Sequence, residues 1–278
     1  MRVSAYDLHC HSTWSDGVLP PAEVVRRAAQ RGVKTLALTD HDEIGGLEAA
    51  RAAAVAAGIE LIDGVEISVT WNAHTLHIVG LRIDPASADL IQGLRANRSG
   101  RNERAERMSA DLARIGIPDV LKGARAFVTN PELVSRAHFA RYLVESGRAR
   151  TTQAVFEHYL VAGKPGYVPH TWAALGDAVA WITAAGGLAV IAHPGRYRME
   201  EPERRKLLCE FRDLGGVALE VVTGSHTPDQ YGQWGRRATE YGFAASVGSD
   251  FHGPQESYRD LGDLPALPSG CEPVWQRF

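Results

Sequence analysis

Histidine and carboxylate residues recur directly after short apolar segments of this 278-residue chain, and both residue types bind divalent cations. One pair is His9-x-His11, and a similar pair, Asp250-x-His252, lies near the other end of the chain. In an extended segment, residues two apart point to the same side, so each pair can present both polar side chains to one cavity. The spacing therefore predicts a metal site with nitrogen and oxygen ligands.

Further residues of the same types follow or lie within the other apolar segments. The predicted metal ligands are His9, His11, Asp16, His41, Glu66, His77, His193, Asp250 and His252. Such a group is costly to leave unpaired in a partly buried cleft, and divalent cations are the natural way to satisfy it. Nine ligands exceed what one ion takes, so we expect two or three ions, with Glu66 as the bridging ligand.

The segments that must position these residues are short, apolar and rich in β-branched residues. Seven of them are predicted strands: Val3–Leu8, Thr35–Leu38, Glu60–Val65, Leu76–Ile83, Leu188–Ala192, Val217–Val222 and Ala244–Val247. Apolar residues at consecutive positions favour strands that are buried on both faces, as in a parallel sheet covered by helices. Strand–helix alternation predicts an α/β barrel or a doubly wound sheet, with polar strand ends meeting at one face.

The alternation stops between about residues 99 and 168, where only helical patterns occur. The predicted helices there run over Glu103–Ile115, from Asn130-Pro131 to about Glu145, and over Thr151–Val161. We therefore predict that residues 1–98 and 169–278 form one barrel domain, and that residues 99–168 form a small all-helical insertion that caps the substrate.

The overall composition narrows the class of protein. The 30 Lys and Arg residues against 33 Asp and Glu residues give a net charge of -3, too balanced for a nucleic-acid-binding surface over the whole protein. Three cysteines cannot form a disulfide framework, which favours a reducing compartment. No segment is apolar over the length that a signal peptide or a membrane span needs, so a cytoplasmic location, away from membranes, is expected.

The metal-ligand motifs also carry a family resemblance. The motifs His9-x-His11, Ser15-Asp-Gly17, Thr39-Asp-His41, Glu66, His77, His193-Pro194 and Asp250-Phe-His252 resemble those of the polymerase and histidinol phosphatase (PHP) family. The resemblance implies a distorted seven-stranded (β/α)7 barrel that holds two or three divalent metal ions, Mn foremost, with Fe, Co or Zn as alternatives.

A finer resemblance concerns the branch of that family related to RNase AM. It depends on Gly163–Pro169, Ala192–Tyr197, Ser225-His226 and Gly248–His252. Members of this branch hydrolyse the 3'-phosphate of nucleoside 3',5'-bisphosphates and trim 5'-phosphorylated short RNA or DNA from the 5' end. The resemblance thus implies a nucleoside bisphosphate or short 5'-phosphorylated oligonucleotide as substrate, and no obligate protein partner is evident.

Several polar residues outside the metal motifs are candidate phosphate ligands. They are Ser135, Arg136, His138, Lys164, Arg196 and His226. Arg196 follows the His193 motif directly, and a guanidinium there suits bidentate phosphate binding. For Ser135, Arg136 and His138, a solvated helix face is the alternative. The arginines at 98, 101, 104 and 107 are interpreted as a solvated helix face, with an oligonucleotide path as the alternative.

These residues together predict a metal-dependent phosphoesterase. Hydroxide generated at the metals would attack phosphorus, and His193 or Asp42 would protonate the leaving oxygen. Three alternatives remain: a histidinol-phosphate phosphatase or other small phosphomonoesterase, an amidohydrolase, and an inactive metal-binding or polymerase-associated module. The amidohydrolase is disfavoured because its carbamylated lysine at a strand end has no counterpart in the sequence.

Overall fold

A barrel of seven consecutive hydrogen-bonded strands forms the centre of the protein, and the computed structural model describes residues 4–278. Val3, with which the first predicted strand begins, lies outside the described residues. In sheet order the strands are β1 (Tyr6–Asp7), β2 (Thr35–Leu38), β3 (Glu60–Trp71), β4 (His74–Leu81), β6 (Leu188–Ile191), β7 (Ala218–Thr223) and β8 (Ala244–Gly248). A two-residue strand, β5 (Ala173–Ala174), pairs with β3 beside this path.

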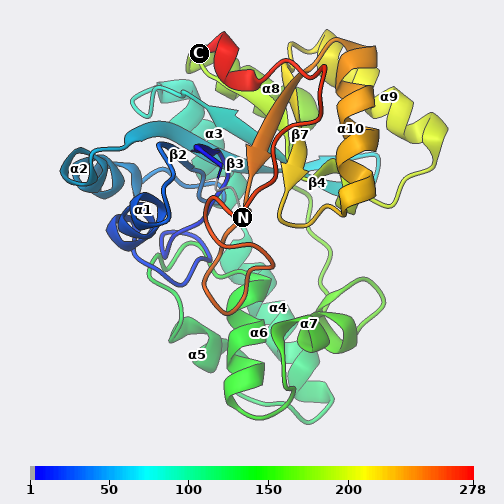
Figure 1. Cartoon of the computed structure of the whole chain (residues 1–278). Helices are drawn as coiled ribbons and strands as arrows, with labels where there is room; N and C mark the ends of the chain where they lie inside the picture. The colour runs from blue at the N-terminus through cyan, green and yellow to red at the C-terminus, as the bar shows by residue number, and fades with distance from the viewer. Residues whose placement is uncertain (1–3) are drawn as a thin grey trace.

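The two ends of the strand path meet, and this contact nearly closes the barrel. The backbone N–H of Leu8, just after β1, donates to the carbonyl oxygen of Val247 in β8 at 2.9 Å. Cys10 and Phe251 then form an isolated parallel bridge beyond the ends of the same two strands. The prediction of a distorted seven-stranded α/β barrel is confirmed (Figure 1).

One strand runs against the predicted parallel direction. β4 is antiparallel to both β3 and β6, whereas the other neighbours on the path are parallel. β3 and β4 form a hairpin joined by Asn72 and Ala73, both with positive φ (46° and 64°), as a tight two-residue turn requires. β3 also extends to Trp71, so Glu66 lies within the strand and not at its predicted end.

Six helices cover the outside of the barrel through apolar faces. They are α1 (Pro21–Gln30), α2 (Leu47–Ala57), α3 (Ala88–Arg98), α8 (Leu175–Ala184), α9 (Glu201–Asp213) and α10 (Pro228–Tyr241). In α1, for example, Val24, Val25 and Ala28 are fully buried against the sheet. Short 3-10 turns lie at Pro194–Arg196 and Val274–Arg277. No helix in residues 4–278 combines the length and the apolar character needed to cross a membrane.

The predicted insertion folds into helices that gather on one side of the barrel (Figure 1). They are α4 (Arg101–Arg114), α5 (Val120–Arg125), α6 (Arg136–Glu145), α7 (Thr152–Val155) and a π-helical turn over Phe156–Leu160. Leu112, Phe139 and Leu160 belong to a hydrophobic cluster whose buried members all lie between Ala105 and Val168. This separate core supports the proposal that residues 99–168 form an insertion domain.

The helix predicted to begin after Pro131 begins five residues later. Ser135 is the N-cap of α6: its hydroxyl accepts a hydrogen bond from the N–H of Ala137, and its own N–H donates to Nδ1 of His138. This capping box satisfies free N–H groups of the first turn, which fixes the start of the helix. Ser135 therefore lies at the N-terminal end of α6. The prediction had placed it on a face of the helix.

Candidate metal centre

Glu66 lies at the centre of a buried group of imidazoles at the open end of the barrel. Its Oε2 lies 2.9 Å from Nδ1 of His41, and 3.3 Å from Nε2 of both His9 and His11. Its Oε1 lies 2.9 Å from Nδ1 of His77 and 3.1 Å from Nε2 of His193. One carboxylate thus faces five imidazoles.

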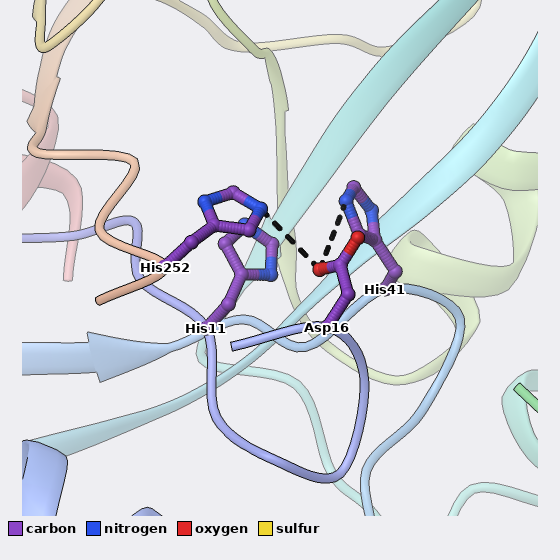
Figure 2. Close-up of side chains that lie close together, drawn as sticks. All are labelled: His11, Asp16, His41 and His252. Atoms are coloured by element: carbon purple, nitrogen blue, oxygen red, sulfur yellow. Dashed lines mark ion pairs between the residues drawn. The ribbon is translucent and has the colours of Figure 1, made fainter. Parts of the chain in front are cut away.

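A second group surrounds Asp16 at the outer edge of this centre. Figure 2 shows the Asp16 carboxylate between the rings of His41 and His252, with His11 beside them. Its Oδ1 lies 3.3 Å from Nε2 of His252 and 3.8 Å from Nε2 of His41. These four side chains can together offer donor atoms to one cation.

The structure brings all nine predicted ligand side chains together. They fall into four overlapping donor groups: His11, Asp16, His41 and His252; His9, Glu66 and His193; His9, His11 and Asp250; and His41, Glu66 and His77. Because neighbouring groups share His9, His11, His41 and Glu66, the centre suits several adjacent ions better than one.

The donor atoms have the unsatisfied polarity that a cation would relieve. Asp16 Oδ1, His41 Nδ1, Glu66 Oε2 and His77 Nδ1 are buried, and none of them makes a hydrogen bond of good geometry although polar neighbours are close. Burial alone would lower the pKa of His11, yet the adjacent Asp250 and Glu66 carboxylates raise it to about 10. The carboxylates therefore favour positive charge at this position, which a divalent cation would supply.

Two buried carboxylates outside the predicted set orient the ligands. Glu220 Oε1 lies 2.7 Å from His9 Nδ1, and Glu220 Oε2 accepts the backbone N–H of His193 at 2.5 Å. With Nδ1 donating to Glu220, Nε2 of His9 is left free to face the centre. Asp40 accepts hydrogen bonds from the backbone N–H of Ser12 and from the Ser12 and Ser15 hydroxyls, and so shapes the loop before Asp16.

Left-handed backbone conformations gather at this centre. Asp42, His193 and Asp250 have φ values of 51°, 31° and 55°. A non-glycine residue in this region costs about 1–3 kcal/mol, so surrounding contacts must hold it there. Two of the three are predicted ligands, and Asp42 directly follows His41.

Two of the predicted phosphate residues lie beside the metal ligands. The hydroxyl of Ser135 donates to Asp16 Oδ2 at 3.3 Å, and Arg196 Nη1 donates to Asp250 Oδ2 at 3.3 Å. The Arg196 side chain is 53% exposed, so its guanidinium is also accessible to a ligand from solvent. Both positions suit contact with a phosphate group that lies at the metals.

A second cationic group lies in the insertion. Arg101 and Arg104 are only 6% and 8% exposed, so their interpretation as a solvated helix face is wrong. Their guanidinium carbons lie over the Trp172 ring, at 4.4 and 5.7 Å from its centroid. Burial lowers the pKa of Arg136. Arg196 and Arg101 lower it further, whereas Tyr167 and Asp16 raise it, so Arg136 lies near both the metal centre and Arg101.

The remaining predicted phosphate residues have other contacts. His226 Nε2 accepts the N–H of Gly195 at 2.8 Å, and its Nδ1 donates to the Val221 carbonyl oxygen at 3.1 Å. Both ring nitrogens are therefore engaged by the backbone, which contradicts a phosphate contact. His138 is buried and caps α6 through Nδ1. Lys164 is exposed, in the turn that follows the π-helical segment.

Comparison with known proteins agrees with the geometry. Residues 7–161, more than half of the chain, match the PHP domain. The chain belongs to the PHP family. The PHP-family resemblance drawn from the ligand motifs is thereby confirmed.

Relatives of this PHP-family chain match it over nearly its whole length. It is 52% identical over 272 residues to a 3',5'-nucleoside bisphosphate phosphatase from Chromobacterium violaceum, covering 98% of this chain and 95% of that protein. It is 44% identical to a 5'-3' exoribonuclease from Haemophilus influenzae, covering 98% of both chains. A solved structure of an amidohydrolase from Chromobacterium violaceum with bound sulfate superimposes with a TM-score of 0.96, at 50% identity, covering 99% of this chain and 95% of that one.

Neither residue predicted to protonate the leaving group is placed for that role in this PHP-family chain. The carboxylate of Asp42 is fully buried, and both of its oxygens already accept hydrogen bonds, from Ser68, Asn97 and Arg101. Burial, then the nearby Arg196, lowers the pKa of His193 to about 3. A neutral imidazole suits a metal ligand and not a proton donor.

His226 is expected to make the stability of this PHP-family chain depend on pH. Burial lowers its pKa from 6.5 to about 4, so the unfolded chain binds the proton more tightly. The stabilisation is present above pH 6.5 and is lost as pH falls toward 4; between pH 7 and 5 one such group accounts for about 2 kcal/mol. Urea unfolding of the metal-free protein at both pH values should show a smaller loss for His226→Gln.

The exposed His158 provides the control for this measurement. His158→Gln should keep the pH dependence of the unchanged protein. Equal pH dependence in His226→Gln and the unchanged protein would contradict a neutral, backbone-bonded His226.

Proposed function

We propose that this protein is a metal-dependent phosphoesterase that removes the 3'-phosphate from nucleoside 3',5'-bisphosphates and also acts on short 5'-phosphorylated oligonucleotides in the 5' to 3' direction. The observation that carries the proposal is the pairing of a nine-ligand centre around Glu66 with a separate cationic group, Arg101, Arg104 and Arg136, in the insertion. The activities named for the two relatives support it.

The centre would hold two or three divalent ions, Mn foremost. Such ions supply Lewis acidity and an activated water at near-neutral pH. The chain's own residues would bind the phosphate and orient the metal ligands. Arg196, beside Asp250, would contact the oxygens of the phosphate to be cleaved, and Ser135 would approach it from the insertion side. Glu220 would keep Nε2 of His9 directed at the centre.

A second phosphate group distinguishes a nucleoside bisphosphate from a simple phosphomonoester. A 5'-phosphate would lie toward Arg136, which is near enough to Asp16 and Arg196 for both to influence its pKa. The bound sulfate of the amidohydrolase structure is a tetrahedral dianion, as phosphate is, and agrees with anion binding on this fold. Among the described strands none ends in a lysine, so the carbamate site of amidohydrolases has no residue here.

The decisive assay compares phosphate release from adenosine 3',5'-bisphosphate and from histidinol phosphate with Mn²⁺ added. We expect a higher kcat/KM for the bisphosphate, because histidinol phosphate carries no second phosphate for the cationic group. Equal or reversed preference would favour the histidinol-phosphate phosphatase. The absence of turnover on several phosphoesters would favour an inactive metal-binding module.

A further inference from the structure

Two nearly buried arginines of the insertion contact barrel loops that carry predicted metal ligands. Arg101 is on α4 and Arg141 is on α6, and their side chains are 6% and 7% exposed. A buried guanidinium is stabilised by carboxylates and carbonyl oxygens that accept hydrogen bonds from its N–H groups. The partners of both arginines belong to the barrel.

Arg141 joins the two loops at the outer edge of the metal centre. Its Nη2 donates to the backbone carbonyl of Asp16, and its Nε and Nη2 donate to Glu256 Oε1 and Oε2 at 2.7 Å each. Glu256 lies on the loop that carries His252. In that loop the Ser257 hydroxyl accepts the N–H of His252 at 2.7 Å. A bidentate pair fixes both the distance and the orientation of its two partners.

Arg101 acts in the same way on the loop after β2. It pairs with the carboxylate of Asp42, which also accepts the Ser68 N–H at 2.8 Å and the Asn97 Nδ2 amide at 2.8 Å. Asp42 directly follows His41 and has the left-handed φ of 51°. The contacts of the Asp42 carboxylate therefore stabilise the turn that orients the His41 ring.

The ligands held in this way belong to the same cation group. Asp16, His41 and His252 are three of its four members, with His11 as the fourth (Figure 2). Asp16 lies in a turn and His252 in a loop, whereas Glu66 and His77 lie within strands whose ladders fix them. Asp16 and His252 therefore depend on tertiary contacts for their positions more than Glu66 and His77 do.

We propose that Arg141, paired with Glu256, is a positioning residue through which the insertion holds the outer cation site formed by His11, Asp16, His41 and His252. The insertion is then part of the metal centre's support as well as a cap over the substrate. Movement of α6 would change the affinity of one ion and leave the inner ions in place. The inference rests on the metal centre of the proposed function, and not on the reaction that the centre catalyses.

The experiment measures Mn²⁺ binding to the full-length protein by equilibrium dialysis, without substrate. Arg141→Ala and Glu256→Gln should each weaken one ion by about 10- to 100-fold, the usual effect of losing an outer partner of a ligand, and leave the tighter ions unchanged. Arg141→Lys should weaken the same ion, because an ammonium cannot form the bidentate pair. Arg148→Ala, an exposed arginine just after α6, is the matched control and should bind as the unchanged protein does.

Two results would overturn the inference: unchanged affinity for every ion in Glu256→Gln, or an equal weakening of all ions. Glu256→Gln keeps the size of the side chain, so it still tests the proposal where Arg141→Ala does not fold. Because the experiment measures Mn²⁺ binding alone, its result does not depend on whether the proposed phosphoesterase activity is present. A chain that binds the ions as expected but hydrolyses no phosphoester would refute the activity and leave the positioning role standing.

Discussion

Glu66→Gln is expected to lose bound metal and at least about three powers of ten in kcat/KM. The glutamine keeps the size of the side chain but removes the charge that faces five imidazoles, at 2.9 to 3.3 Å from its two oxygens. Metal ions supply several kcal/mol of transition-state stabilisation, and about 1.4 kcal/mol corresponds to each factor of ten. Metal content per chain and phosphate release with added Mn²⁺ measure the two effects.

Glu220→Gln provides a matched control, because Glu220 is also a buried glutamate of the same centre but contacts His9 at Nδ1, away from the donor groups. The loss there should stay within about 10- to 100-fold, as for other residues that orient a metal ligand. Full metal content and turnover in Glu66→Gln would show that Glu66 does not bridge the ions. A larger loss in Glu220→Gln than in Glu66→Gln would contradict the assignment of both.

The convergence of the nine predicted ligand side chains could be predicted from the sequence because its signal is local. A pair such as His9-x-His11 fixes which side chains share a face, and the position after an apolar run fixes which end of the barrel they reach. Glu220 has no such signal. It is one carboxylate inside an apolar run, and only the packing of β7 beside His9 shows that its charge is compensated.

The direction of β4 could not be predicted for a similar reason. Apolar residues at consecutive positions indicate a buried strand but carry no information about the direction of its neighbours. The turn that reverses the chain, Asn72-Ala73, lacks the glycine that most often marks a tight hairpin. His77 still reaches the centre, because it lies opposite Ser68 in the ladder, and Ser68 shares a face of β3 with Glu66.

The arginines of the insertion were misinterpreted because helical charge patterns do not report tertiary contacts. Arg101 and Arg104 lie on a helix with many exposed charges, which is typical of a solvated face. Their burial depends on Asp42 and Trp172, which are remote in sequence. Contacts between residues this far apart in the sequence can be identified only once the fold is known.

The cationic group leads to the second large effect. Arg136→Gln is expected to raise KM for adenosine 3',5'-bisphosphate by roughly 10- to 150-fold, because a hydrogen bond to a charged group contributes about 1.5–3 kcal/mol. KM for adenosine 3'-monophosphate, which lacks the second phosphate, should change little. Steady-state kinetics on both substrates, with saturating Mn²⁺, measure the difference.

Arg196→Ala separates the two phosphate positions, because Nη1 of Arg196 lies 3.3 Å from Oδ2 of Asp250 at the metal centre. Loss of the Arg196 guanidinium should impair hydrolysis of the bisphosphate and of the monophosphate to a similar extent. Lys122→Ala, on the exposed side of α5, should leave both substrates unaffected. If Arg136→Gln weakens both substrates equally, the distal phosphate does not contact Arg136, and the insertion recognises the substrate through other groups.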